Sequence, residues 1–372
     1  MAPPLHVGFN ALFLDPAGSG GVDTYLRGLV PALVREFPRI EPTVFTTRRG
    51  ARALLDDGWS DFARIVRFPF DEGQRERRLL AEQVGVVGGA LLRGVHILHS
   101  LASTGPVRPV VPSVVTVHDV TFFRMRTFGR VTTAGMRAVV TGAARSADAL
   151  IAVSEAARDE IAEQLRIPPD RFVVVPHGAG RLPSAEPTAP DLVSERLGLD
   201  GRRLALCVAA VRPHKNQRLL VEALPRLPQD VAVVLVGIHE AGARELPARA
   251  ERLGVADRLC MPGYLPDADV EALWRMADCA VFPTRAEGFG LPVLEAMRRG
   301  VPVACSDIAV LHEVGADAAR YFPPDDAAAA ARAIMLAMED RTAAARGRAR
   351  AETFTWEAAA RGTYEAYRRA LS

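Results

Sequence analysis

The sequence predicts an α/β protein built from two parallel-sheet domains. Its 372 residues exceed the roughly 100–200 that one domain usually takes. Short, almost wholly apolar segments alternate with longer amphipathic ones, as strands and helices do when helices cover both faces of a parallel sheet. The alternation stops once, at residues 182–191, and then starts again. We therefore expect two domains of similar size.

The first half is expected to begin with a strand, a glycine-rich loop and a helix. Residues 5–13 form an apolar run, residues 18–21 read Gly-Ser-Gly-Gly, and residues 22–37 carry apolar side chains three and four apart, as one face of a helix does. The loop lacks the third glycine of a dinucleotide-binding fingerprint. Further strands are expected at 43–46, 65–68, 96–99, 113–117, 149–153 and 172–175, and helices at 74–92, 130–145 and 155–165.

The segment at residues 182–191 is expected to be an interdomain linker. It contains three prolines and almost no side chain that a core would bury. We expect a first domain at residues 1–183, a second at 184–355, and a C-terminal helix at 356–372 that packs back on the first. In the second domain, strands are expected at 204–209, 231–236, 258–261, 279–283 and 302–305, and helices at 217–224, 243–253, 268–276 and 292–299.

The composition excludes several classes of protein. Lys and Arg number 46 against 44 Asp and Glu, a net charge of +2, so charge gives no reason to expect a nucleic-acid partner. The four cysteines lie in the second half without zinc-type spacing, which favours a reduced, cytoplasmic protein. We expect no secretory signal and no transmembrane segment, because no apolar stretch approaches the roughly 20 residues that a membrane span needs. Peripheral membrane contact stays open, as does the oligomeric state.

The most informative stretch is residues 283–297, Pro-Thr-Arg-Ala-Glu-Gly-Phe-Gly-Leu-Pro-Val-Leu-Glu-Ala-Met. A strand is expected to end at Pro283, and Pro292 stands where the first turn of a helix tolerates proline. The amides and dipole of a helix start attract phosphate or hydroxyl oxygens. Glu287 and Glu295 only accept hydrogen bonds when ionised, so they should hold hydroxyl groups rather than phosphate. This combination predicts a site for a nucleoside-diphosphate sugar.

The stretch resembles the E-x7-E signature of retaining glycosyltransferases with the GT-B fold (family 4-like, group 1). The resemblance covers most of the chain and implies two Rossmann-like domains that face each other across a cleft, with the acceptor in the first and the donor in the second. Five further segments follow in the family's order: Leu-Ile-Ala-Val-Ser-Glu at 150–155, Val-Pro-His-Gly at 175–178, Arg-Pro-His-Lys-Asn at 212–216, Gly-Tyr-Leu-Pro at 263–266 and Gly-Val-Pro-Val at 300–303.

The resemblance implies a role for each matching residue. Glu287 would contact hydroxyls of the donor sugar and Glu295 those of the ribose. Lys215, the only lysine of the chain, would contact the diphosphate, which gains charge as it leaves and is stabilised by a fixed ammonium. The resemblance also implies that the backbone of Tyr264 and Leu265 contacts the base. The loop of Gly20 and Gly21 would contact the donor phosphate or the acceptor. The backbone amides that would contact sugar and phosphate are those of Gly288, Phe289, Gly290 and Leu291.

One position near Lys215 departs from the family's pattern. The family commonly has an arginine five residues before this lysine, where the present chain has Ala210. Arg212 lies only three residues before it. Either Arg212 supplies the missing charge from another angle, as a further catalytic residue, or it faces solvent.

In the first domain, residues 116–119 (Thr-Val-His-Asp) end an expected buried strand. Ligands bind at the carboxyl ends of parallel strands. His118 resembles the family's histidine that contacts the donor sugar near its reacting carbon; the alternative is a core histidine. Asp119 either orients His118 or begins the next turn.

An arginine cluster and an Asp-x-Asp motif need separate interpretations. No acidic residue lies between Asp119 and Asp148. The arginines of this segment are Arg124, Arg126, Arg130, Arg137 and Arg145. They either bind a phosphorylated or lipid-linked acceptor, lie near an anionic membrane, or form a solvated helix face. The candidate acceptor-binding residues are Asp119, Arg124, Arg126 and Arg145. Asp267-Ala-Asp269 resembles a D-x-D metal motif but is expected to cap a helix. We therefore expect neither a metal nor another cofactor.

The function implied is transfer of a hexose from a nucleoside-diphosphate sugar to a hydroxyl of a glycan, lipid-linked or natural-product acceptor, with retention of configuration. His-Asp-Val-Thr-Phe-Phe at 118–123 and residues 212–216 look most like mannosyltransferases of surface polysaccharides, which makes GDP-mannose the first expected donor. A UDP- or dTDP-sugar enzyme of natural-product biosynthesis, a nucleotide-sugar epimerase and a sugar-binding protein are the alternatives. A pyridoxal-phosphate phosphorylase is excluded, because its Schiff-base lysine would have to be Lys215.

Overall fold

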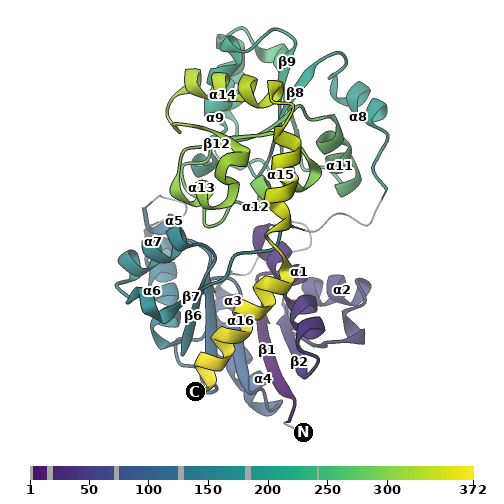
Figure 1. The fold of residues 1–372 in the computed structure, drawn as a ribbon. Coiled ribbons are helices and arrows are strands. Elements are labelled where there is room, and N and C mark those ends of the chain that lie inside the picture. Colours follow the sequence, from purple (N-terminus) through teal and green to yellow (C-terminus); the bar gives the residue numbers. More distant parts are fainter. Residues whose placement is uncertain (1–2, 15–19, 71–74, 125–129, 181–185, 241–242) are drawn as a thin grey trace. The chain divides into compact units, whose positions relative to one another are not determined.

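The computed structural model describes residues 3–14, 20–70, 75–124, 130–180, 186–240 and 243–372. The chain divides into two compact units (Figure 1): unit 1 comprises residues 1–178 and 355–372, and unit 2 comprises residues 179–354. The first boundary therefore falls five residues before the position expected from the sequence. Each unit is a parallel sheet with helices on both faces, so the predicted fold class is confirmed.

Unit 1 holds a sheet of seven parallel strands in the order β3-β2-β1-β4-β5-β6-β7. The strands are β1 (Leu5–Ala11), β2 (Ile40–Thr46), β3 (Arg64–Arg67), β4 (Ile97–Ser100), β5 (Ser113–Val117), β6 (Ala149–Ala152) and β7 (Phe172–Val174). The helices are α1 (Gly21–Glu36), α2 (Arg48–Asp56), α3 (Arg75–Leu80), α4 (Val87–Leu92), α5 (Thr121–Arg124), α6 (Arg130–Ser146), α7 (Glu155–Leu165) and α16 (Trp356–Leu371). A π-helical segment, Ala81–Val86, joins α3 to α4 without a break.

The two faces of this sheet bury different helices, because successive side chains of a strand point to opposite faces. Val7 and Phe9 pack in one apolar cluster with side chains of α1 and α16. Phe45 and Leu98 pack in a second cluster, with side chains of α4. A methyl group at Gly28 of α1 would lie 2.1 Å from the Trp356 ring, so α1 and α16 approach each other closely only because this position is glycine.

A chain of buried hydrogen bonds ties α16 into the core of unit 1. The Tyr367 hydroxyl lies 2.9 Å from Nδ1 of His99, and Nε2 of His99 lies 2.8 Å from Oγ1 of Thr116. Thr116 in turn lies 3.0 Å from the Tyr25 hydroxyl on α1. Burial lowers the pKa of His99 to about 3, so its ring is neutral at neutral pH and each of its nitrogens has a partner.

Unit 2 holds six parallel strands in the order β10-β9-β8-β11-β12-β13. The strands are β8 (Arg203–Val208), β9 (Val231–Val236), β10 (Leu259–Gly263), β11 (Cys279–Phe282), β12 (Val303–Ser306) and β13 (Ala319–Phe322). The helices are α8 (Pro190–Leu197), α9 (Arg218–Ala223), α10 (Glu245–Arg252), α11 (Asp267–Met276), α12 (Leu291–Arg299), α13 (Ala309–Gly315), α14 (Ala327–Glu339) and α15 (Ala343–Glu352). The expected linker overlaps α8, which begins at Pro190.

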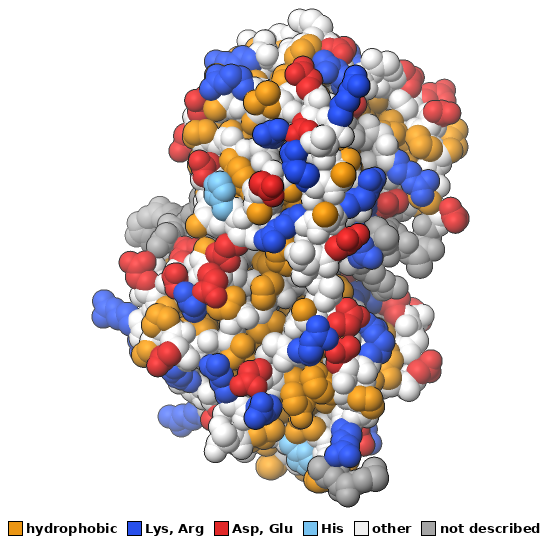
Figure 2. Space-filling view, viewed as in Figure 1, with side chains coloured by type: hydrophobic (Ala, Val, Ile, Leu, Met, Phe, Trp, Pro, Cys, Tyr) orange, Lys and Arg blue, Asp and Glu red, His pale blue; other side chains and the backbone are white. Residues whose placement is uncertain are grey.

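The surface carries charges of both signs. Figure 2 shows Lys, Arg, Asp and Glu side chains close to one another over each unit. No helix among the described residues is long and apolar enough to cross a membrane. The four cysteines are free thiols.

Candidate functional site

The site in unit 2 is built on the start of α12. β11 ends at Phe282, and after an eight-residue connection α12 begins at Leu291. Gly290 precedes the helix with φ 104°, where a methyl group would lie 2.8 Å from Leu311, so only glycine fits. Pro292 occupies the first turn, where its missing N–H costs no helical hydrogen bond. The positive end of the α12 dipole therefore adjoins the loop that carries Glu287.

A second loop, between β8 and α9, brings Lys215 to the same place. Asn216 adopts a left-handed conformation (φ 56°), and its Nδ2 donates to the carbonyls of Pro283 at 3.1 Å and Pro324 at 2.8 Å. The amide of Arg285 donates to the His214 carbonyl at 2.8 Å. These bonds fasten the two loops together although they lie about 70 residues apart in the sequence.

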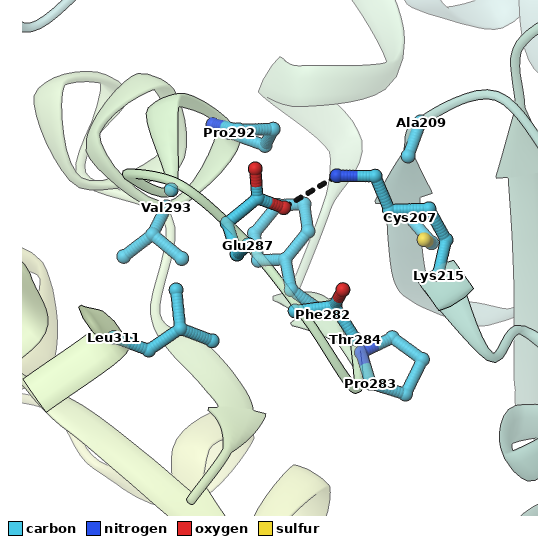
Figure 3. Close-up of a pocket in the computed structure, with 11 residues that line it drawn as sticks. Cys207, Ala209, Lys215, Phe282, Pro283, Thr284, Glu287, Pro292, Val293 and Leu311 are labelled. Atoms are coloured by element: carbon cyan, nitrogen blue, oxygen red, sulfur yellow. Dashed lines mark hydrogen bonds and ion pairs between the residues drawn. The ribbon is translucent and has the colours of Figure 1, made fainter. Parts of the chain in front are cut away.

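The fastened loops place Lys215 and Glu287 in direct contact (Figure 3). The Lys215 ammonium donates a hydrogen bond to a carboxylate oxygen of Glu287, and each side chain is 20% exposed. The pair lines a pocket together with apolar side chains that include Phe282, Val293 and Leu311. Charge interactions strengthen beside apolar side chains, because these lower the local dielectric constant. Two residues predicted separately from the sequence thus form one ion pair.

Glu295 lies one turn into α12, in a setting that disfavours its charge. It is partly buried, and a methyl group at Gly180 would lie 2.8 Å from its side chain. Burial raises the pKa of Glu295 to about 7. The positive charge of Arg299 acts to lower this pKa, and the negative charge of Glu271 acts to raise it. The Arg299 guanidinium is already engaged, since it donates to both carboxylate oxygens of Glu271, at 2.7 and 3.1 Å. Hydroxyl donors from a ligand would therefore favour the ionised form of Glu295.

Of the other predicted donor residues of unit 2, only Gly290 lines the pocket of Lys215 and Glu287. The residues outside it are Arg212, Tyr264, Leu265, Gly288, Phe289, Leu291 and Glu295. Tyr264 and Leu265 follow β10 and so lie at the carboxyl edge of the sheet, the edge to which the Lys215 loop also belongs. Tyr264 is exposed and Leu265 half-buried. Arg212 forms an exposed ion pair with Glu240, with its nitrogens 2.9 and 2.7 Å from one carboxylate oxygen. Of the two interpretations of Arg212, the observed contact matches a surface position.

His118 follows β5 at the carboxyl edge of the sheet in unit 1. Its Nε2 lies 2.7 Å from the Leu101 carbonyl, which can only accept, so the proton sits on Nε2 and leaves Nδ1 as an acceptor. Burial lowers the pKa of His118, and the ring is neutral at neutral pH. Asp119 accepts a hydrogen bond from the Thr121 amide at 2.9 Å and so begins the next turn.

Two aromatic residues beside His118 were not predicted as part of a site. The Tyr25 ring meets His118 edge-on with centroids 5.1 Å apart, and the His177 ring lies 5.3 Å from that of His118. Burial lowers the pKa of His177 well below its ordinary value. His177 stands in the Val-Pro-His-Gly segment, just past the end of β7. Its place at the carboxyl end of an expected strand is the sequence feature that could have identified it as a site residue.

The acceptor-side candidates do not gather at one place. Arg145 lies near the end of α6 and donates to the Leu165 carbonyl at 3.1 Å, beside the amino end of β6 and thus at the edge opposite His118. Arg126 lies outside the described residues, as does the side chain of Arg124. Gly20 and Gly21 open α1, with Gly20 at the capping position.

The expected capping role of Asp267-Ala-Asp269 is wrong. The residue at the capping position of α11 is Pro266, and no side chain caps the helix. Asp269 instead joins α11 to the segment around α8, accepting from Thr188 at 2.6 Å and from Arg196 at 2.6 Å. Buried Asp269 is therefore occupied as a structural ion-pair partner. Among the residues that the structure describes, no group of His, Cys, Asp and Glu is placed to hold a metal ion.

Comparisons with known proteins assign the two halves of the chain to two domain families. The family described as Glycosyltransferase Family 4 matches residues 19–179, and that described as Glycosyl transferases group 1 matches residues 192–354. O-antigen chain mannosyltransferase B of Escherichia coli is 34% identical over 237 residues, which are 60% of this chain and 61% of that protein. The match thus spans less than two thirds of that relative's length.

Other similar proteins extend over more of the chain. A D-inositol 3-phosphate glycosyltransferase of Segniliparus rotundus is 29% identical in a match that covers 95% of this chain and 85% of that protein. The crystal structure of Anabaena HepE in complex with UDP-glucose has a TM-score of 0.73 at 20% identity, covering 98% of this chain and 99% of that one. At this identity the structural likeness shows the fold, which is the fold that the resemblance implied.

Proposed function

Because the chain belongs to the glycosyltransferases that combine a family 4 domain with a group 1 domain, we propose that it transfers a hexose from a nucleoside-diphosphate sugar to an acceptor hydroxyl with retention of configuration. The observation that carries this proposal is the ion pair of Lys215 and Glu287 at the start of α12. It offers a cation and a helix end to a diphosphate, and a carboxylate to the adjoining sugar.

In the ligand-free pair, the ammonium and the carboxylate neutralise each other. A bound diphosphate would take over the ammonium of Lys215, and Glu287 would then accept hydrogen bonds from sugar hydroxyls. The partly buried carboxylate of Glu295 has little access to water. The ribose hydroxyls would donate hydrogen bonds to it in place of water. The same three side chains would thus contact three successive parts of one donor molecule.

In the proposed reaction, the bond between the anomeric carbon and the leaving phosphate oxygen breaks while the acceptor oxygen bonds to that carbon from the same face. The acceptor's proton passes to an oxygen of the departing phosphate. The diphosphate gains negative charge in this step, and Lys215 together with the positive end of the α12 dipole would stabilise it. This arrangement is the reason for proposing a reaction without a metal.

The O-antigen chain mannosyltransferase of E. coli supports mannose as the transferred sugar and a glycan as acceptor, and GDP-mannose is the first donor that the resemblance implies. The UDP-glucose complex of Anabaena HepE makes a UDP-sugar the second candidate, and a dTDP-sugar with a natural-product or lipid-linked acceptor the third. Contact of His118 with the donor sugar stays a prediction from the resemblance, as does a cytoplasmic location.

The proposal is tested by thermal unfolding with GDP, UDP, dTDP and ADP, followed by a transfer assay with the matching nucleotide sugar. A ligand at 100 times its Kd stabilises the native protein by about 2.7 kcal/mol, so the correct nucleotide should raise the Tm most. Lys215→Ala should lose this shift, whereas Arg202→Ala should keep it, because Arg202 pairs with Asp257 away from the pocket. Epimerisation of the donor without an acceptor would favour the epimerase alternative, and binding without turnover a sugar-binding protein.

A further inference from the structure

The segment that runs from α3 through the π-helical turn into α4 has large apolar side chains on its solvent-exposed side. Glu82, Val86 and Ala90 lie four residues apart and are buried against unit 1. The spacing of four follows from the π-helical turn Ala81–Val86, which has more residues per turn than an α-helix. The residues halfway between these buried ones must therefore point outward.

Val84 lies halfway between Glu82 and Val86, and Leu80 and Leu92 lie two residues before Glu82 and two residues after Ala90. Leu80 and Val84 are each 65% exposed, and Leu92 is 85% exposed. A surface helix of a globular protein normally presents polar residues on that side. An apolar outer side therefore marks a surface that binds something.

A neighbouring loop widens this surface. The Val107 amide donates to Oε1 of Gln83 at 2.8 Å, and Nε2 of Gln83 donates to the Gly105 carbonyl at 2.9 Å, so the loop is fastened beside the helix. In the described part of unit 1, the large exposed apolar side chains outside this region are Leu55 and Leu371. We call the remaining six the apolar stripe: Leu80, Val84, Leu91, Leu92, Val107 and Val110.

The helical segment and its neighbouring loop carry a surplus of positive charge. Residues 76–110 contain four arginines, Arg77, Arg78, Arg93 and Arg108, and two acidic residues, Glu76 and Glu82. Glu82 is buried beside Arg78. Arg77 and Arg108 are exposed and lie next to stripe residues in the chain, as does exposed Glu76. The stripe thus combines exposed apolar side chains with a surplus of positive charge.

We propose that the apolar stripe docks unit 1 on the surface of an anionic phospholipid bilayer. The apolar side chains would enter the boundary between headgroups and acyl chains, and the arginines would contact lipid phosphates. Residues 75–92 span roughly 27 Å at 1.5 Å per residue, so the helical segment would lie in the plane of the membrane. A second copy of the chain fits this surface less well, because a two-fold contact would bring together two copies of one positively charged patch.

Co-sedimentation of the full chain with lipid vesicles tests the proposal. We expect binding to vesicles of phosphatidylcholine with 30% phosphatidylglycerol and much weaker binding to phosphatidylcholine alone. The triple variant Leu80→Gln, Val84→Gln, Leu92→Gln should bind at least tenfold more weakly, since one buried leucine contributes roughly tenfold. Arg77→Gln and Arg108→Gln should each weaken binding about fivefold, the effect of about one charge at an anionic surface.

The matched control changes three exposed leucines of unit 2: Leu192→Gln, Leu253→Gln, Leu336→Gln. It should bind the anionic vesicles as the parent chain does, and both triple variants should keep the parent's Tm because the changed side chains point outward. The proposal is wrong if the parent chain binds neither vesicle, or if the control weakens binding as much as the stripe variant. It is also wrong if light scattering finds a dimer that only the stripe variant dissociates, because the stripe would then join two copies of the chain.

Discussion

Glu295→Gln should remove a pH dependence from donor binding. The pKa of this carboxyl is raised from 4.5 to about 7 in the ligand-free protein. Ribose hydroxyls that donate to the carboxylate stabilise its ionised form, so binding lowers the pKa. Protein protonated at Glu295 must lose that proton on binding, and affinity therefore falls as pH falls below about 7. If the bound pKa returns to its ordinary value, the affinity drops about tenfold between pH 8 and pH 6.

Calorimetric titration with an intact nucleotide sugar measures this effect, because its diphosphate has no group that titrates in that range. The parent protein should release close to one proton per donor bound at pH 6 and far less at pH 8. Glu295→Gln should bind with nearly equal affinity at both values, and a donor lacking the ribose hydroxyls should do the same with the parent protein. If the parent's affinity is equal at pH 6 and pH 8, or if the variant keeps the pH dependence, Glu295 does not hold the ribose.

The same shift predicts a stability effect of opposite sign. The folded state holds the Glu295 proton more tightly than the unfolded chain does, so this group's contribution to stability is present at low pH. It is lost as pH rises from about 4.5 to about 7. At pH 8, Glu295→Gln should therefore stabilise the ligand-free protein, by up to about 3 kcal/mol from the size of the shift. Urea unfolding at pH 5 and pH 8 measures it, and a variant less stable than the parent at pH 8 would contradict the assignment.

Four further substitutions have definite expected outcomes. Lys215→Ala and Glu287→Ala should each lower the transfer rate about 10- to 150-fold, the loss of one charge-assisted hydrogen bond, with unchanged Tm; unchanged rates in both would remove them from the site. His118→Ala should lower kcat more than it raises KM for the donor, and a change in KM alone would mean that it only binds. Tyr367→Phe should destabilise the protein by about 1–3 kcal/mol in urea unfolding, because buried Nδ1 of His99 loses its partner; no loss would exclude a role for this bond.

Much of the donor site could be predicted because its signals are local. The glycine before a proline-containing helix start fixes the place of Glu287 and Glu295 from a few neighbouring residues. The contact between Lys215 and Glu287 could not be predicted in this way, since it depends on Asn216 bonding to carbonyls far away in the sequence. Asp269 was misjudged for the same reason, because its partners lie in the segment around α8, more than 70 residues away.

Several elements gave too weak a pattern to be predicted. α2 contains three arginines and a glycine in nine residues, so its apolar side is short. β13 has only Ala319 and Phe322 buried, which is no run of apolar side chains. The helix expected at 74–92 exists as α3, the π-helical turn and α4, but the turn shifts its phase, and a spacing of three and four could not show which apolar residues stay exposed.

The most direct test of the account is a crystal structure of the protein soaked with its nucleotide sugar. We expect the diphosphate about 3 Å from the Lys215 ammonium and beside the start of α12, with Glu287 on a sugar hydroxyl and Glu295 on the ribose. A donor bound elsewhere in the chain, with Lys215 still paired to Glu287, would contradict the account.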